Sequence, residues 1–364
     1  MMSPALATLE ILSLKLIQRY YVPKELLKPA EQAVLHEILV VPIRLRVCIL
    51  LKNIINAYWH LMSPSARRLL RAFVMVHEEA KQKNFLASQI LKAMNKVIPV
   101  LPPRPVQPVV STFKNMDFLS EFSPLDIAKT MTLIDWEVFK MIKPEEFLKQ
   151  TWTKRPEKAP NLRAMIDRFN KITEWIVSHV VSGEKIKIRV KRYCKFVAIA
   201  EELKNFGSFH SFMAVLAALT QNPLTRLKFT LSEIPPRVKE QQKALEEIMS
   251  VENSYKNYRE TLSSFLNNSK YPTIPYLGVF FRDIIYMDDG LKNDAGKYNT
   301  KYILSIYGII SQIQISQDHP GYPFEINEKL DKYLREMPNI FPTKILNDMV
   351  RQKEPKTATR ADIE

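Results

Sequence analysis

Apolar residues recur along most of the chain at spacings of three and four residues, which is the period of an α-helix and not of a strand. In the first hundred residues this pattern predicts helices over 1–22, in a run from Pro42, in a run from Pro64 and over 85–96. No stretch shows the sustained alternation of apolar and polar residues that a strand requires. The pattern therefore predicts an all-α protein, without a repeat of fixed period.

A proline-rich stretch divides the pattern into two parts. Residues 97–109 read VIPVLPPRPVQPV, and prolines at this density exclude a helix and favour a semi-rigid extended spacer. Recognition by an SH3 domain is the other interpretation of this stretch. The expected organisation is a helical N-terminal unit over 1–96, a proline-rich linker over 97–116, a second helical domain over 117–345 and a polar tail over 346–364.

Helical patterns continue after the linker. Ser123 stands directly before Pro124, and together they predict a capped helix start. Further helices are expected at Trp136–Met141, Pro144–Trp152, Asn161–Val181, Ile186–Leu203 and Phe209–Leu219, then as a charged pair within 233–266 and as a last helix over Tyr298–Gln317. The segment Phe209–Leu219 is small and apolar on most sides, so we expect it at the centre of the domain.

The stretch over 271–290 combines more structural signals than any other part of the chain. Pro272 and Pro275 keep its first residues extended, and Gly278 lets the chain turn. A short helix over Val279–Met287 is predicted to follow, and a glycine is placed to end it. This helix is expected to pair with the last predicted helix as a helical hairpin.

Two faces of that short helix differ in chemistry. The residues at helical spacing are Phe280, Asp283, Ile284 and Met287 on one face, and Phe281, Ile285 and Asp289 on the other. Asp288 and Asp289 lie at the C-terminal end of the helix, where the helix dipole disfavours negative charge that has no partner. A core helix with a solvated acidic end is the alternative interpretation of this stretch.

Composition narrows the classes of function. Only 7 glycines occur and none precedes Gly183, so the first half has no glycine-rich phosphate loop or dinucleotide motif. The 2 cysteines give no disulfide framework and no metal spacing, and they fit a reducing compartment. There is no uncharged apolar run of about 18 residues, so no membrane span is expected, and no signal-peptide pattern is present.

The net charge and the spacing of the histidines narrow the possible classes of function further. The net charge of +15 is dispersed among acidic residues, which favours an acidic protein partner or an acidic lipid surface over nucleic acid. The 6 histidines stand singly, without the spacing of metal ligands, and no serine or cysteine motif indicates a covalent nucleophile. From the residues alone, no metal, no cofactor and no bond-making active site are expected.

Five segments taken together resemble the catalytic domain of Ras-family guanine-nucleotide exchange factors, of which Son of sevenless is the familiar member. They are FSPLDIAKTMTLID (122–135), PEEFLKQTWTK (144–154), APNLRAMIDRFNKITEWI (159–176), NPLTRLKFTLSEIP (222–235) and IPYLGVFFRDIIYMDDG (274–290). Their order and spacing are those of the family over residues 117–340. The segments LIQRYYVPKELL (16–27) and IRLRVCILLKNIINAYW (43–59) are similar to the helical Ras exchanger motif that precedes such domains.

The resemblance implies a use for the acidic helix end. In the family, the helical hairpin that begins with this helix wedges into the nucleotide site of the GTPase. Ile285 stands where an apolar side chain crowds the magnesium position, and Asp289 stands where a carboxylate approaches the phosphate-binding loop. The family acid is usually glutamate, which is longer than Asp289. With the neighbouring Asp288, these residues are the expected catalytic group.

A second surface of the family grips the switch region of the GTPase and buries a tyrosine in a pocket. The residues expected on this surface are Ile166, Met213, Thr220, Tyr255, Tyr276, Arg282 and Asp283. The sequence departs from the family where Thr220 replaces an asparagine, where Ser208-Phe209-His210-Ser211 replaces Asn-Phe-Asn-Ser, and where Tyr298-Asn299 replaces an Asn-Phe pair. For Met213, Tyr255 and Tyr276, simple core packing is the alternative interpretation.

The resemblance thus predicts a cytoplasmic exchange factor, recruited to membranes, that binds a Ras, Rap or Ral type GTPase and releases GDP without covalent chemistry. The departures at Thr220 and over Ser208–His210 favour a rival, a helical scaffold that binds GTPases without exchanging nucleotide. The N-terminal unit is expected to brace the hairpin, and a second, allosteric GTPase site is the alternative. A basic nucleic-acid-binding protein is the third interpretation.

Overall fold

The computed structural model describes residues 9–21, 39–59, 62, 64–79, 90, 94, 118–268, 271–290, 300–359 and 362–363. The chain forms two compact units that divide between Val106 and Gln107. This division falls inside the segment predicted as a linker, 97–116, which itself lies outside the described residues. Among the described helices, none combines the length and the apolar character that crossing a bilayer would need.

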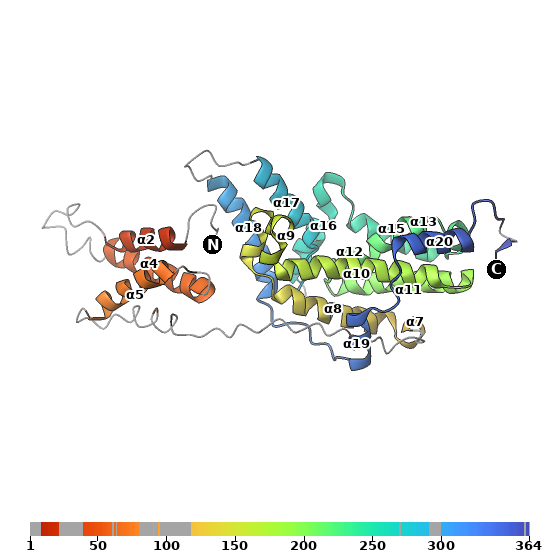
Figure 1. Cartoon of the computed structure of the whole chain (residues 1–364), viewed down its shortest axis with the longest axis horizontal. Helices are drawn as coiled ribbons and strands as arrows, with labels where there is room; N and C mark the ends of the chain where they lie inside the picture. Colours follow the sequence, from red (N-terminus) through yellow and green to blue (C-terminus); the bar gives the residue numbers. More distant parts are fainter. Residues whose placement is uncertain are drawn as a thin grey trace. The chain divides into compact units, whose positions relative to one another are not determined.

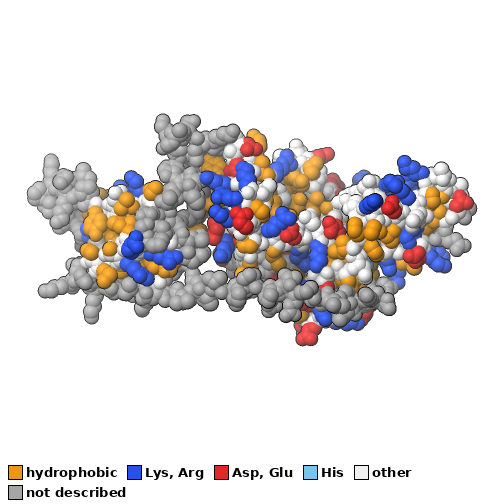
Figure 2. Space-filling view, in the orientation of Figure 1, with side chains coloured by type: hydrophobic (Ala, Val, Ile, Leu, Met, Phe, Trp, Pro, Cys, Tyr) orange, Lys and Arg blue, Asp and Glu red, His pale blue; other side chains and the backbone are white. Residues whose placement is uncertain are grey.

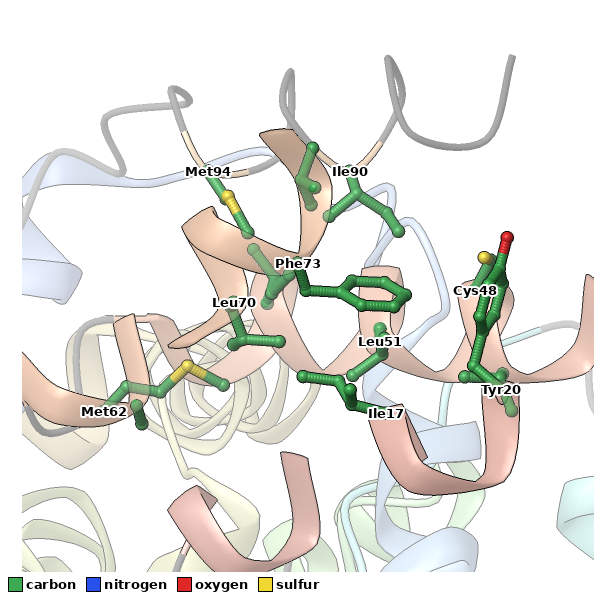
Figure 3. Packing of buried hydrophobic residues seen from close by; sticks show 13 residues of the cluster. Ile17, Tyr20, Cys48, Leu51, Met62, Leu70, Phe73, Ile90 and Met94 are labelled. Carbon is green, nitrogen blue, oxygen red and sulfur yellow. The ribbon is translucent and has the colours of Figure 1, made fainter. Parts of the chain in front are cut away.

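The first unit is built from helices that each bury one apolar face. They are α2 (Leu9–Tyr20), α4 (Val41–Tyr58) and α5 (Pro64–Glu79). Leu51 of α4 and Leu70 of α5 have no exposed surface, and they belong to one cluster to which all three helices contribute (Figure 3). The helix predicted over 85–96 lies outside the described residues apart from Ile90 and Met94, which are buried in the same cluster.

The second unit is helical throughout its described residues. Its elements are α7 (Phe118–Glu121), α8 (Pro124–Lys140), η5 (Pro144–Gln150), α9 (Thr151–Lys154), η6 (Pro156–Lys158), α10 (Pro160–Ser182), α11 (Ile186–Asn205), α12 (Phe209–Leu219), α13 (Asn222–Thr225), α14 (Lys228–Ser232), α15 (Pro236–Ile248), α16 (Glu252–Asn268), α17 (Leu277–Gly290), α18 (Thr300–Gln317), α19 (Glu328–Glu336) and α20 (Thr343–Lys353). Neither unit has a strand among its described residues, so the all-α prediction is confirmed there.

Two helix predictions differ from the structure. The separate helix predicted at Trp136–Met141 is wrong, because no proline or glycine interrupts the chain at that point and α8 runs on unbroken to Lys140. The helix predicted at Pro144–Trp152 is instead a 3₁₀ segment, η5, followed by a short α9. The chain kinks at Lys149, so a continuous helix does not form there.

The core of the second unit surrounds Trp175 of α10. Helices α10, α11 and α12 pack together in the middle of this unit (Figure 1). The fully buried Trp175 ring meets Phe118 of α7 and Phe196 of α11, each at 5.5 Å between centroids. It also meets Tyr333 of α19 at 6.3 Å. Segments from both ends of the domain therefore pack against α10. Helix α12 is buried along most of its length, as predicted.

Polar side chains fix two helix starts. Ser123 accepts a hydrogen bond from the backbone N–H of Asp126 at 3.1 Å, which confirms the predicted cap of α8. At the start of α10, the buried carboxylate of Glu146 accepts hydrogen bonds from the backbone N–H groups of Asn161 and Leu162, at 2.9 and 2.8 Å. The helix dipole favours a carboxylate at this place. This cap joins η5 to α10, and η5 also packs against α17.

Helix α20 extends the second unit beyond its predicted end. Leu346 and Val350 are buried, and α20 packs against α10 and α13. The domain boundary at 345 and the polar tail over 346–364 are therefore wrong for the described part of this segment. The reason is that the burial of this helix of 11 residues depends on packing against segments distant in the sequence, which its own charged residues do not indicate.

Glu354, directly after α20, fastens this end of the unit. Its buried carboxylate pairs with Arg189 of α11 at 3.1 Å and accepts hydrogen bonds from the backbone N–H groups of Phe229 and Thr230, at 2.8 and 3.1 Å. Arg189 also donates to the carbonyl oxygen of Gly183 at 3.1 Å. Although Arg189 belongs to a basic run in the sequence, its side chain is only 1% exposed and serves the core.

Candidate functional site

The entry to α17 is fixed to the start of α12. The backbone N–H of Ile274 donates to the carbonyl oxygen of Gly207, and the N–H of Phe209 donates to that of Ile274, both at 2.9 Å. Gly207 has φ +69°, a conformation that favours glycine, and a Cβ there would approach a phenylalanine ring to 3.1 Å. The hydroxyl of Tyr322 donates to the carbonyl oxygen of Pro272 at 2.8 Å.

Tyr276 and Gly278 meet at the first turn of α17. A Cβ on Gly278 would lie 2.3 Å from the ring of Tyr276, so a glycine is needed here to make room for the ring. The sequence instead suggests that this glycine lets the chain turn. The backbone N–H of Tyr276 donates to the hydroxyl of Tyr258 at 2.7 Å. Burial raises the pKa of Tyr276, and the nearby Tyr255 raises it further, so its hydroxyl stays protonated at neutral pH.

One side of α17 is bound to the rest of the unit. We call Phe280, Phe281, Asp283, Ile284 and Asp288 the inner face. Ile284 has no exposed surface, and the ring of Phe281 stacks on Trp152 of α9 with centroids 4.6 Å apart. Asp283 forms an ion pair with Arg259 of α16 at 2.8 Å. The carboxylate of Asp283, which was predicted to bind the GTPase, therefore already forms an ion pair within the chain.

The opposite side of α17 is open to solvent. We call Arg282, Ile285, Tyr286 and Asp289, which share the spacing i, i+3, i+4 and i+7, the outer face. Ile285 is 39% exposed and Tyr286 is 80% exposed. The guanidinium of Arg282 lies 5.6 Å from the centroid of the Tyr255 ring, in a cation–π contact. Tyr286 is missing from the residues predicted for the site, although its spacing from Arg282 and Asp289 indicates it.

The two neighbouring aspartates at the end of α17 have different surroundings. Asp289 is exposed on the outer face. Asp288 is directed toward η5 and α18, and it accepts hydrogen bonds from the hydroxyl of Tyr302 at 2.7 Å and from the amide Nε2 of Gln150 at 3.2 Å. Of the predicted catalytic group, Ile285 and Asp289 thus share the outer face, and Asp288 does not.

A cavity of about 380 Å³ lies beside α17. Its lining residues come from α9, α10, α12 and the start of α17, and they are Trp152, Thr153, Arg163, Ile166, Phe169, His210, Tyr276, Gly278 and Phe281. Of the predicted GTPase-binding residues, Ile166 and Tyr276 meet here. The walls are mainly aromatic, which suits an apolar or aromatic side chain with few polar contacts.

His210, which stands where the resemblance implies an asparagine, lines the cavity from the start of α12. It is 2% exposed, and its Nε2 lies 3.1 Å from the carbonyl oxygen of Met165. Nε2 therefore carries the proton of this contact. Burial lowers the pKa of His210; Asp135 raises it and Arg168, the ion-pair partner of Asp135, lowers it further. The ring is neutral at neutral pH.

Two other predicted contact residues lie away from the cavity lining. Met213 is half-buried in α12, one turn after His210. Thr220 is exposed at the C-terminal end of α12, about 15 Å along the helix from His210 at 1.5 Å per residue. Its hydroxyl donates to the carbonyl oxygens of Leu216 and Ala217, at 3.3 and 3.2 Å. The structure thus separates Thr220 from Ile166 and Tyr276.

Tyr255 lies in a strained segment at the start of α16. Asn253, Ser254 and Tyr255 have φ values of 48°, 59° and 63°, and left-handed backbone costs each such residue about 1–3 kcal/mol. Arg259 Nε donates to the carbonyl oxygen of Ser254 at 2.8 Å. Because Arg259 also pairs with Asp283, the position of Tyr255 is tied to that of α17.

A comparison with protein families identifies the domain. The family model described as RasGEF domain matches residues 126–304, from the first turn of α8 to the start of α18. Through this segment the chain belongs to the RasGEF domain family. The matched segment holds both faces of α17 and the whole lining of the cavity.

Three curated relatives of this RasGEF domain come from Dictyostelium discoideum. Ras guanine nucleotide exchange factor G is 36% identical over 240 residues, 65% of this chain and 15% of that protein. Factor A is 29% identical over 352 residues, 88% of this chain and 56% of that protein. Factor I is 31% identical over 365 residues, 93% of this chain and 43% of that protein. The chain thus spans between 15% and 56% of the length of these relatives.

Proposed function

We propose that this chain binds a Ras-type small GTPase and accelerates the release of its bound GDP. The observation that carries the proposal is the outer face of α17, where Ile285 and Asp289 are exposed next to a helix side that is firmly held. The relatives are named as Ras guanine nucleotide exchange factors, which supports exchange over passive binding.

The two exposed residues have complementary tasks in this proposal. The carboxylate of Asp289 is an acceptor for the backbone N–H groups and the lysine that otherwise hold the nucleotide phosphates of a GTPase. Ile285 brings an apolar side chain to the magnesium position, where an ion that requires oxygen ligands loses its favourable surroundings. No bond is made or broken in the chain itself.

The cavity supplies affinity in the same proposal. An aromatic side chain from the switch region of the GTPase fits against Ile166, Phe169 and Tyr276. The half-buried Tyr255, whose ring lies beside Arg282, and the exposed Tyr286 offer further aromatic contacts from α16 and α17, and aromatic residues are frequent at the energetic centre of interfaces. We expect Tyr255→Ala to weaken GTPase binding more than it slows the step that releases nucleotide, as measured by the dependence of the exchange rate on exchanger concentration.

Thermodynamic linkage explains how such contacts promote exchange. If the exchanger lowers the affinity of the GTPase for nucleotide, then nucleotide lowers the affinity for the exchanger by the same factor. The nucleotide-free GTPase is therefore the form that binds best. Nucleotide rebinding then displaces the exchanger, and GTP loads when it is the more abundant nucleotide.

Stopped-flow release of a fluorescent GDP analogue tests the proposal on a panel of purified Ras, Rap and Ral type GTPases. Wild type is expected to accelerate release from at least one of them. Ile285→Ala and Asp289→Ala are each expected to slow the maximal rate by about tenfold or more while the unfolding midpoint is unchanged. Ile315→Ala, on an exposed apolar residue of α18, is the matched control. Wild-type rates in both α17 variants would refute this division of tasks.

A pull-down separates exchange from passive scaffolding. An exchanger retains nucleotide-free GTPase in preference to the GDP-bound or GTP-bound form, because of linkage. A scaffold without exchange activity shows no preference for the nucleotide-free form. Equal retention of all three forms would therefore favour the scaffold, for which the departures at Thr220 and His210 are the sequence argument.

Peripheral attraction to acidic membranes completes the proposal. The net charge is +15, and in Figure 2 basic side chains alternate with acidic ones over the visible face of the second unit. Such a surface supports a weak, salt-sensitive attraction and not a single deep binding site. Sedimentation with phosphatidylserine vesicles is expected to fall strongly between about 50 and 200 mM salt, a range over which the Debye length halves.

A further inference from the structure

The hydrogen bonds of Asp288 join three elements around the hairpin. Tyr302 donates from α18 to Oδ1 at 2.7 Å, and Gln150 donates from the end of η5 to Oδ2 at 3.2 Å. Both carboxylate oxygens are therefore used inside the chain. One side of the same helix is also held two turns earlier by the stack of Phe281 on Trp152.

The backbone at Gln150 is strained where it makes this contact. Lys149 and Gln150 both have φ 55°, in the left-handed region that non-glycine residues rarely adopt. Such conformations persist where the surroundings determine them, and they are concentrated at functional sites. Here the preceding Phe147 is buried and the following Trp152 is held by Phe281, so the segment between them is fixed from both sides.

The Tyr302 hydroxyl is a reliable donor to Asp288. Tyr302 is 9% exposed, at the side of α18 that faces α17. Burial raises the pKa of Tyr302, and its hydrogen bond and charge contact with Asp288 raise it further, so the hydroxyl keeps its proton at neutral pH. A hydrogen bond to a charged acceptor is stronger than one between neutral groups.

We propose that Gln150, Asp288 and Tyr302 form a positioning tie that sets the direction of the outer face of α17 relative to η5 and α18. The inference rests on the proposed function, and it makes Asp288 a positioning residue and not a group that touches the GTPase. Asp289 follows Asp288 directly, so any rotation of the helix end moves the outer carboxylate. A displacement of about 1 Å at a reacting site is enough to cost about a hundredfold in rate.

Substitution by asparagine distinguishes the tie from a direct role. Asp288→Asn keeps the shape and an acceptor for Tyr302, and the amide of Gln150 can turn over to accept from the new amide group. A tie therefore tolerates asparagine, whereas a carboxylate that acts on the phosphate-binding site does not. Asp288→Ala and Tyr302→Phe both break the tie, and the second removes a single oxygen. Tyr307→Phe, on an exposed tyrosine of α18, is the matched control.

Two measurements on the full chain test the inference. The first is the maximal rate of GDP release, separated from the exchanger concentration at half-maximal rate. The second is hydrogen exchange of the backbone amides of α17, which needs no GTPase. We expect Asp288→Ala to lower the maximal rate about tenfold and Tyr302→Phe about threefold, with little change in the half-maximal concentration, and both to speed amide exchange at the end of α17. Asp288→Asn and Tyr307→Phe are expected to stay within about twofold of wild type.

The outcomes separate the inference from the function on which it rests. Equal losses of rate in Asp288→Asn and Asp288→Ala would overturn the tie and assign the carboxylate a direct role. Wild-type rate and wild-type amide exchange in Tyr302→Phe would also overturn it. If wild type releases nucleotide from no GTPase of the panel, the proposed function fails, while faster amide exchange in Asp288→Ala and Tyr302→Phe alone still supports the tie.

Discussion

Two parts of the second unit use carboxylates in opposite ways. Glu354, after α20, is buried and shares its hydrogen bonds with Arg189 and the start of α14. Asp289, at the end of α17, is exposed on the outer face. A buried carboxylate is tolerated only when its partners are present, whereas an exposed one keeps its hydration until a partner replaces it. The difference indicates that one end stabilises the fold and the other is available for binding.

The largest expected effect is on stability at the Glu354 end. Glu354→Ala leaves Arg189 buried without its counter-charge, so the free energy of unfolding is expected to fall by about 3–5 kcal/mol. Urea unfolding at pH 7 measures this. The control is Glu240→Ala on the exposed side of α15, which is expected to change the same quantity by less than about 0.5 kcal/mol. A loss below about 1 kcal/mol in Glu354→Ala would break the comparison between the two ends.

At the hairpin end, the next largest effect is expected from an exposed side chain. Tyr286→Ala should leave unfolding unchanged, because the residue is 80% exposed. If the outer face contacts a GTPase, the same change should weaken binding of nucleotide-free GTPase by about tenfold, as loss of an interfacial aromatic residue often does. Surface plasmon resonance measures the affinity, and Tyr307→Ala on α18 is the control. Unchanged affinity in Tyr286→Ala would place this residue outside the interface.

A pH series extends the comparison to the cavity. The ordinary pKa of His210, 6.5, applies in the unfolded chain, and burial lowers it in the fold. Between these two values the unfolded state binds more protons, so stability falls as the pH drops below about 6.5, by up to about 1.4 kcal/mol per pH unit. Urea unfolding between pH 5 and 7.5 measures the slope. His210→Asn, which introduces the residue implied by the family resemblance, should reduce the slope of stability against pH. An equal slope in both proteins would assign the pH dependence to other groups.

The smallest expected effect is that of Asp289→Glu on the maximal exchange rate. Asp289→Glu lengthens the side chain to that of the usual family acid without changing its charge. We expect a maximal exchange rate within about threefold of wild type and an unchanged unfolding midpoint, because the site is exposed. Stopped-flow nucleotide release measures it beside Asp289→Ala. A loss as large as that of the alanine variant would show that the outer face depends on the exact reach of this carboxylate.

Local patterns in the sequence predict much of the fold. The stripe over Asn161–Val181 corresponds to α10, and the segment Phe209–Leu219 corresponds to the central α12. The cap at Ser123 and the pairing of α17 with α18 are also predicted, because both depend on residues close together in the chain. Helix α20 and the kink at Lys149 are not predicted, since both depend on packing against distant segments.

In the candidate site, too, some features follow from local sequence patterns and others only from packing. The family motifs and the helical spacing are enough to indicate Ile285 and Asp289. Both single out Asp289, but neither shows that Asp288, the same residue type one position earlier, is held by hydrogen bonds inside the domain. Adjacent residues of a helix point about 100° apart, and only the packing of η5 and α18 decides which of them is held inside.

The sequence by itself therefore determined the helical fold class and, through its motifs, the RasGEF family and the helix that carries the candidate site. Tertiary structure alone decided that Arg189 pairs with a glutamate 165 positions away, that Gln150 reaches Asp288, and which aromatic rings enclose the cavity. The physical reason is that helical periodicity is a local property of the chain. Burial and hydrogen-bond partners instead depend on segments that meet only when the core forms.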